Sequence, residues 1–197
     1  MGSETTFSRR EALAGSLIGS ALGGIAISGT SKAQAAAQSG VLVAYFTRTE
    51  NTRLIATQLA SKLNATLFRI EPAVAYPEDY EQQVAQAEQE RLAGFEPPLR
   101  ETVASWSAYQ SVFLGFPVWG MTAPSIIRSF LAQHDFSGRD LVPFITHGGY
   151  GTGSSLDVLR RYAPNARIGD AFIRECDQER ATLNAVTQWL ATVESQR

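Results

Sequence analysis

Three short, largely apolar runs, each followed by a loop rich in Thr, Gly or Pro, constrain the fold of this chain most. The runs cover residues 41–46, 111–116 and 141–146. Apolar runs of this length, bounded by turn residues, are typical of strands buried on both faces, as in a parallel sheet. Pro143 weakens the prediction for the third run, because proline cannot donate a hydrogen bond within a sheet.

Helical patterns separate these predicted strands. After the first run, Leu54, Ile55, Leu59 and Leu63 recur with helical spacing. The other predicted elements are a strand over 66–70, an exposed polar helix over 78–91, helices near 126–131 and 156–162, a last strand near 168–172 and a closing helix over 178–193. Five strands alternating with helices predict βαβ units, and therefore a single α/β domain with a doubly wound parallel sheet.

Composition limits the classes of partner and site. Hydrophobic residues form 44% of the 197 residues, which is enough for a packed core and argues against disorder. The formal net charge of −2 offers no basic surface, so nucleic acid is not expected as a partner. One cysteine, Cys176, and two histidines exclude an internal disulfide framework and disfavour a metal centre. We interpret Cys176 as a structural or idle thiol.

The first 35 residues have the three regions of an export signal. Arg9 and Arg10 precede a stretch without charge, and Ala33-Gln34-Ala35 is a small-x-small cleavage pattern. The segment resembles a twin-arginine signal, which implies export, to the periplasm, of a protein that has already folded around its cofactor. We therefore expect a signal over 1–35 and a domain over 36–197, with membrane contact only through an uncleaved signal. The alternative is a chance arginine pair before a flexible tail or weak anchor.

The loop after the first strand, Thr47–Thr52, gathers hydroxyl and amide groups at a helix N-terminus. Such a terminus has unpaired N–H donors and a partial positive charge, so it suits a phosphate. The alternative is an ordinary helix cap, since Thr and Asn both favour that position, although one cap explains only one or two of these residues. The sequence lacks the G-x-x-x-x-G-K-[ST] and G-x-G-x-x-G motifs of other phosphate folds.

Two more loops follow predicted strands at the same edge of the sheet. In the loop over 115–124, Trp119 lies between Pro117 and Gly120 and has the shape to stack on a flat ligand. Packing of Trp119 under its own loop is the alternative. The loop over 146–153 contains four glycines, which permit close approach of the backbone to a ligand or simply provide positive φ angles.

The order T-R-T-E-N-T, G-F-P-V-W, T-H-G-G-Y-G resembles the flavodoxin family of FMN-binding proteins. The resemblance spans residues 41 to about 175 and implies a five-stranded parallel sheet of order 2-1-3-4-5, in a three-layer sandwich, with FMN at its switch point. By position, it assigns the FMN phosphate to Thr47, Arg48, Thr49, Glu50, Asn51 and Thr52. It assigns the isoalloxazine ring to Pro117, Val118, Trp119, Gly120, Thr146, His147, Gly148, Gly149 and Tyr150.

Glu50 departs from the family pattern, which usually has glycine at this position. A carboxylate beside a phosphate is repulsive, and Glu adopts glycine's backbone conformations only at a cost. A carboxylate that points into solvent would leave its amide for the phosphate. We expect Glu50→Gly to tighten FMN binding.

The resemblance implies electron transfer through FMN, with a redox protein or a quinone-like molecule as partner. The alternatives are an FMN-dependent NAD(P)H:quinone-type oxidoreductase and a flavin-free binding module that kept the fold. Export weighs against the oxidoreductase, because a soluble nicotinamide donor is not expected outside the cytoplasm. His147 is a candidate proton relay, but we favour its interpretation as an ordinary hydrogen-bonded loop residue. The sequence has no G-x-S-x-G elbow, so a hydrolase is not expected.

Overall fold

The computed structural model describes residues 40–176 and 179–195. These residues fall in the compact unit Ala36–Arg197. The predicted export signal over 1–35 lies outside the described residues. Among the helices of the described part, none is long and apolar enough to cross a membrane.

A parallel sheet forms the centre of the fold, as the apolar runs predicted. β1 (Val41–Tyr45) pairs on one side with β2 (Thr66–Arg69) and on the other with β3 (Ser111–Pro117). β4 (Asp140–His147) follows beside β3. Every residue of β1 is buried, as expected for a strand covered on both faces. With β5 (Arg167–Ile168) beside β4, the strand order β2-β1-β3-β4-β5 confirms the predicted doubly wound α/β fold and its switch point between β1 and β3.

The last strand of the sheet is interrupted, which the sequence did not predict. β5 (Arg167–Ile168) and β6 (Phe172–Glu175) both pair with β4, so the centre of the strand expected near 168–172 is a break. Gly169 donates to the carbonyl of Leu141, so Pro143, two residues further along β4, faces the same neighbour. The missing N–H of Pro143 therefore falls opposite the break, which explains how a proline is tolerated inside this strand.

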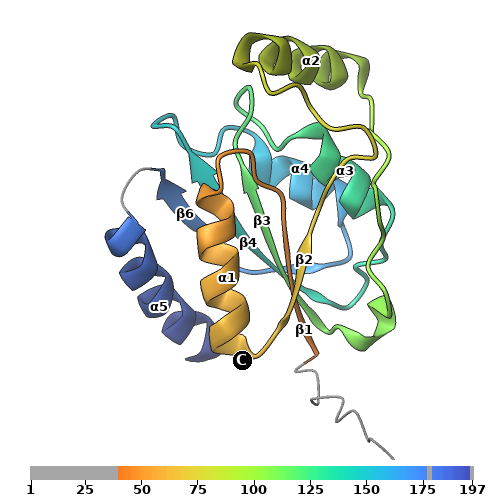
Figure 1. Cartoon of the computed structure of the whole chain (residues 1–197). Coiled ribbons are helices and arrows are strands. Elements are labelled where there is room, and N and C mark those ends of the chain that lie inside the picture. The colour runs from red at the N-terminus through yellow and green to blue at the C-terminus, as the bar shows by residue number, and fades with distance from the viewer. Residues whose placement is uncertain (1–39, 177–178, 196–197) are drawn as a thin grey trace, which may run out of the picture. The chain divides into compact units, whose positions relative to one another are not determined.

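Helices of the described part cover both faces of the sheet (Figure 1). α1 (Asn51–Leu63) and α5 (Glu179–Ser195) pack on one face, and α3 (Ser125–Ala132) and α4 (Ser155–Tyr162) cover the other. The alternating side chains of the strands feed the two cores. Fully buried members of the cores include Val43, Ile55, Leu59 and Phe113 on the α1 side and Leu42, Leu114, Ile126 and Phe130 on the α3 side.

β3 and β4 pack tightly near the carboxyl ends of the strands. The ring of Phe144 in β4 lies over Gly115 in β3, and a Cβ on Gly115 would come within 1.9 Å of that ring. Both residues are close to the two loops that follow these strands. The glycine therefore leaves room for the Phe144 ring where the predicted site begins.

α2 (Tyr80–Ala93) lies beyond the carboxyl ends of the strands rather than against the sheet (Figure 1). The segment that contains α2 begins and ends at a short antiparallel bridge between Pro72 and Leu99. Next to this bridge, Glu71 forms an ion pair with Arg100 at 2.7 Å. After this segment the chain returns through a short helix, η1 (Trp106–Ala108), before β3. α2 matches the helix predicted over 78–91, with its bounds shifted by two residues.

Candidate functional site

A cavity of about 490 Å³ opens at the carboxyl ends of β1, β3 and β4. Its volume is in the range of small-molecule sites, and it lies where doubly wound sheets bind their ligands. All three predicted loops contribute to its lining. The predicted site residues that line it are Thr47, Arg48, Thr49, Asn51, Thr52, Pro117, Val118, Trp119, Gly120, Thr146, His147 and Gly148.

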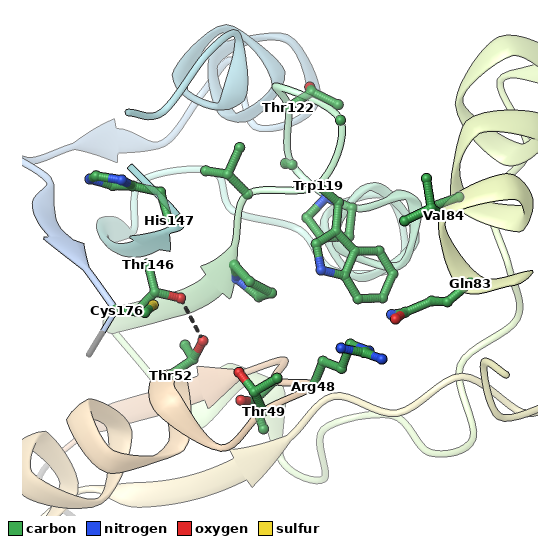
Figure 2. A pocket seen from close by; sticks show the side chains of 18 of the residues that line it. Arg48, Thr49, Thr52, Gln83, Val84, Trp119, Thr122, Thr146, His147 and Cys176 are labelled. Carbon is green, nitrogen blue, oxygen red and sulfur yellow. Dashed lines mark hydrogen bonds between the residues drawn. The ribbon is translucent and has the colours of Figure 1, made fainter. Parts of the chain in front are cut away.

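One corner of the cavity is rich in hydroxyl groups. Thr52 in the first turn of α1 and Thr146 at the end of β4 are both buried, and their Oγ1 atoms lie 2.9 Å apart (Figure 2). Thr49 accepts a hydrogen bond from Asn51 at 3.2 Å. No side chain caps the N-terminus of α1 in the structure's described part, so the ordinary-cap interpretation of this loop is not what the geometry supports. Free amides and hydroxyls at a helix N-terminus suit an anion.

Glu50 lies at the N-cap position of α1 in the left-handed conformation, with φ 65°. Glycine adopts this conformation freely, whereas a glutamate adopts it only at an energetic cost. The Glu50 carboxylate pairs with Arg53 and, at 3.3 Å, with Arg69, and the residue does not line the cavity. The two arginines thus offset the negative charge of Glu50 and stabilise its exposed side chain outside the cavity.

Arg48 extends from the same loop toward α2, beneath Trp119 and away from Thr52 (Figure 2). Its guanidinium donates to the carbonyl of Glu78 at 3.2 Å and lies 5.3 Å from the ring centre of Tyr80. No carboxylate of the described residues forms an ion pair with it. Its positive charge is therefore available to a ligand on the α2 side of the cavity.

The sequence left open whether Trp119 packs under its own loop or faces a ligand, and the structure is compatible with both. The Trp119 ring packs edge-on against Phe46 and Tyr76, each at 5.1 Å between ring centres, and it also lines the cavity. Trp119 and Thr122 exchange backbone hydrogen bonds around a two-residue turn. The central residues, Gly120 and Met121, both have positive φ, as in a type I′ turn. The turn holds the indole at the cavity wall.

The last two residues of β4, Thr146 and His147, and the first residue after it, Gly148, line the cavity. His147 accepts a hydrogen bond from the N–H of Gly149 on Nδ1 at 3.1 Å, and its carbonyl accepts from Cys176. Gly149 and Tyr150 do not line the cavity, and Tyr150 is 82% exposed. Tyr150 therefore lies in solvent rather than over the cavity in this structure.

A further glycine of the loop after β4 is required by packing. Gly153 has φ 51°, and a Cβ at this position would come within 2.0 Å of the carbonyl oxygen of Met121. The same carbonyl accepts a hydrogen bond from the N–H of Ser154. Gly153 thus joins the loop after β4 to the Trp119 turn, which fixes two walls of the cavity relative to each other.

Sequence reasoning missed the wall that α2 contributes. Gln83, Ala87 and Arg91 recur every four residues and so share one helix face. The lining residues that were not predicted are Tyr80, Gln83, Val84, Ala87, Glu88, Arg91, Thr122, Ala123, Pro124, Ser125 and Cys176. The four-residue spacing was the available signal, but the weak amphipathicity of this helix did not distinguish the face from a solvated one.

Tyr76 connects α2 to the cavity wall that Trp119 forms. The hydroxyl of Tyr76 donates to Glu90 at 2.8 Å, and Gln86 donates to the other carboxylate oxygen at 2.9 Å. Burial, together with this hydrogen bond to a carboxylate, raises the pKa of Tyr76, so the hydroxyl stays protonated and remains a donor. Because the Tyr76 ring also packs on Trp119, this residue links the helix to the ring wall.

The fold and the cavity define a class of protein, the doubly wound α/β domains that hold a ligand at the switch point of a parallel sheet. The family model for flavodoxin matches residues 40–193. The chain belongs to the flavodoxin family. No curated protein matches it.

Solved structures with the same fold support this assignment. A candidate flavoprotein from Bacteroides uniformis is 27% identical, with a TM-score of 0.67 over 77% of this chain and 97% of that chain. A candidate flavoprotein from Bacteroides eggerthii is 28% identical, with a TM-score of 0.67 over 78% and 97%. A flavoprotein from Lactobacillus acidophilus, solved in complex with FMN, is 16% identical and shares the fold, with a TM-score of 0.59 over 73% and 97%.

Proposed function

We propose that this protein binds FMN and acts in electron transfer. The observation that carries the proposal is that one cavity at the switch point unites a hydroxyl-rich helix terminus with a tryptophan wall. Membership in the flavodoxin family supports it, as does the fold shared with a flavoprotein solved in complex with FMN. FMN, when bound, supplies the redox chemistry, and the protein sets its position and access.

The residues present fit such a cofactor. The phosphate would be held by Thr47, Thr49, Asn51 and Thr52, together with the uncapped amides of α1. The ring would lie against Trp119, between the loops that follow β3 and β4. The Glu50 carboxylate, which faces Arg53 and Arg69, leaves this corner open to an anion.

A titration of the FMN-free protein tests the phosphate corner. We expect FMN to bind at least tenfold more tightly than riboflavin, which lacks the phosphate, because a charge-assisted hydrogen bond contributes about 1.5–3 kcal/mol. Thr47→Val should reduce this preference and leave the affinity for riboflavin unchanged. Equal affinities for the two flavins would contradict the assignment of the corner. A colourless native protein that takes up neither flavin would instead support a flavin-free binding module.

The second candidate function is an FMN-dependent NAD(P)H:quinone-type oxidoreductase. The α2 wall favours it, because Val84 and Arg91 enclose space beside Trp119 that a small acceptor can occupy. Quinone reduction driven by NADH or NADPH distinguishes the candidates. Turnover with a nicotinamide donor supports the oxidoreductase. Reduction only by a redox protein supports electron carriage.

We also propose that residues 1–35 are a twin-arginine signal and that the protein works in the periplasm. The support is the order of the arginine pair, the uncharged stretch and the Ala33-Gln34-Ala35 site in the sequence. Replacement of Arg9 and Arg10 by lysine should retain the precursor in the cytoplasmic fraction. An unchanged periplasmic yield, or a mature protein that still begins at Met1, would argue against this signal.

A further inference from the structure

The α2 side of the cavity has polar groups that the hydroxyl-rich corner does not use. Gln83 is only 3% exposed, and its side chain lines the cavity opposite Trp119 (Figure 2). In the described part of the chain, Gln83 forms a backbone hydrogen bond to Asp79, and no hydrogen bond joins its side-chain amide to the protein. Gln83 as a residue is buried while its amide opens into the cavity, so the amide's donors and acceptor are available there to a ligand.

The surroundings of Gln83 define the chemistry of that ligand. The Arg48 guanidinium, which forms no ion pair with the described residues, approaches Gln83 below the indole (Figure 2). Val84, the next residue of α2, and Trp119 form apolar surfaces. Two amide hydrogens and a guanidinium donate to an oxyanion, and an indole stacks on a flat ring.

Arg91 limits this space at the other end of α2. Its guanidinium lies beside Gly120, because a Cβ added to Gly120 would be 3.7 Å from Nε of Arg91. Arg91 also forms an ion pair with Glu88 at 3.6 Å. Because Glu88 offsets the charge of Arg91, the uncompensated positive charge of this wall belongs to Arg48. The carboxylate of a bound molecule is therefore expected at the Arg48–Gln83 end.

We infer that Gln83 and Arg48, with Trp119 and Val84, form a second subsite that binds a flat aromatic carboxylate beside the cofactor. The inference rests on the proposed function, because it assigns the α2 side of the cavity to a second ligand once FMN occupies the loop side. The small-molecule partner would then be an aromatic compound that carries a carboxylate.

Calorimetric titration of the FMN-loaded protein with 2-naphthoate and with 2-naphthamide tests the subsite. The two probes have nearly the same shape and differ in charge, so we expect naphthoate to bind about tenfold more tightly. Gln83→Leu should weaken naphthoate binding about tenfold, because a hydrogen bond to a charged group is lost. Gln89→Leu, at an exposed position of the same helix, is the matched control and should change nothing.

FMN affinity, measured in the same variants, separates this inference from the proposed function. Gln83→Leu should leave the affinity for FMN unchanged, and retained FMN binding also shows that the variant is folded. Equal binding of the two probes, an unaffected Gln83→Leu variant, or a parallel loss of FMN affinity would each overturn the subsite. Failure of the wild-type protein to take up FMN would refute the proposed function itself.

Discussion

The hydroxyls of Thr52 and Thr146 lie 2.9 Å apart although the residues are 94 positions apart in the sequence, and both residues are 1% exposed. This contact joins the first turn of α1 to the end of β4. It connects the hydroxyl-rich corner to the end of β4 on the other side of the cavity. Each hydroxyl retains a lone pair or hydrogen for a ligand, since a threonine hydroxyl both donates and accepts.

Replacement of either threonine by valine should destabilise the protein. Valine keeps the shape of the side chain but leaves the other hydroxyl buried without its partner, at a cost of about 1–3 kcal/mol. Replacing both should cost less than the sum of the two single changes, because no unpaired hydroxyl then remains. Urea denaturation of the FMN-free wild type, the single variants and the double variant measures the coupling. Strict additivity would show that the two hydroxyls do not interact.

Two substitutions at Glu50 separate the effect of its charge from that of its backbone. Glu50→Gly should tighten FMN binding severalfold, because it removes a negative charge next to the proposed phosphate position. It also leaves Arg53 without its ion pair, whereas Arg69 keeps its pair with Glu71. It should also stabilise the fold by about 1 kcal/mol, since glycine adopts φ 65° without steric cost. The lost ion pairs are exposed and offset little of this gain.

Glu50→Gln is the matched variant for this prediction. It removes the charge but retains a side chain at positive φ, so it should tighten FMN binding without stabilising the fold. High salt should reduce the gain in affinity for both variants, because the effect is electrostatic. Weaker FMN binding by Glu50→Gly would contradict the argument from charge.

The features of this fold that depend on local patterns could be predicted from the sequence. The apolar run beginning at Val41 is buried on both faces, and the position of a loop after such a strand determines which edge of the sheet it joins. For this reason the three loops that the sequence singled out contribute to one cavity. The order of the strands and the switch point followed from the resemblance rather than from any periodicity.

What could not be predicted depends on contacts between distant segments. The break in the last strand lies opposite Pro143, a residue on another strand, and no local signal near Gly169 shows it. The burial of Gln83 likewise depends on where α2 lies, and a polar residue on a polar helix gives no indication of it. Glu50 adopts positive φ although its residue type disfavours this, and two arginines from different elements stabilise its carboxylate.

Gly153→Ala should disrupt the junction between the two loops. The new Cβ would lie 2.0 Å from the Met121 carbonyl oxygen, so the backbone must move and the Trp119 turn with it. Gly151→Ala is the matched control, because Gly151 also has positive φ, at 72°, but nothing lies within 4 Å of its Cβ position. The control should cost only about 1 kcal/mol in backbone strain.

The comparison is made by thermal unfolding and by FMN titration of both variants. We expect Gly153→Ala to lower both the unfolding temperature and the affinity for FMN by more than Gly151→Ala does. Identical effects would mean that positive φ alone, rather than the contact with Met121, explains the requirement for glycine.

We expect His134 to make the stability of the fold depend on pH. Its ring is buried against Trp106 and Phe130, each at 4.5 Å between ring centres. The N–H of Val103 donates to Nε2 at 3.4 Å, so Nδ1 carries the proton and donates to the carbonyl of Phe130 at 2.8 Å. Both nitrogens of the neutral ring are thereby paired, and burial lowers the pKa of His134 in the folded protein.

This lowered pKa determines the direction of the pH dependence. Below about pH 6.5 the unfolded chain takes up a proton on His134 that the folded protein resists, so the free energy of unfolding should decrease as the pH falls from 7.5 to 5. His134→Gln retains a donor and an acceptor but does not titrate. The wild type should therefore exceed this variant in stability most at pH 7.5, with a gap that narrows toward pH 5. Urea denaturation of the FMN-free proteins at several pH values measures the gap, and a gap independent of pH would contradict this role of His134.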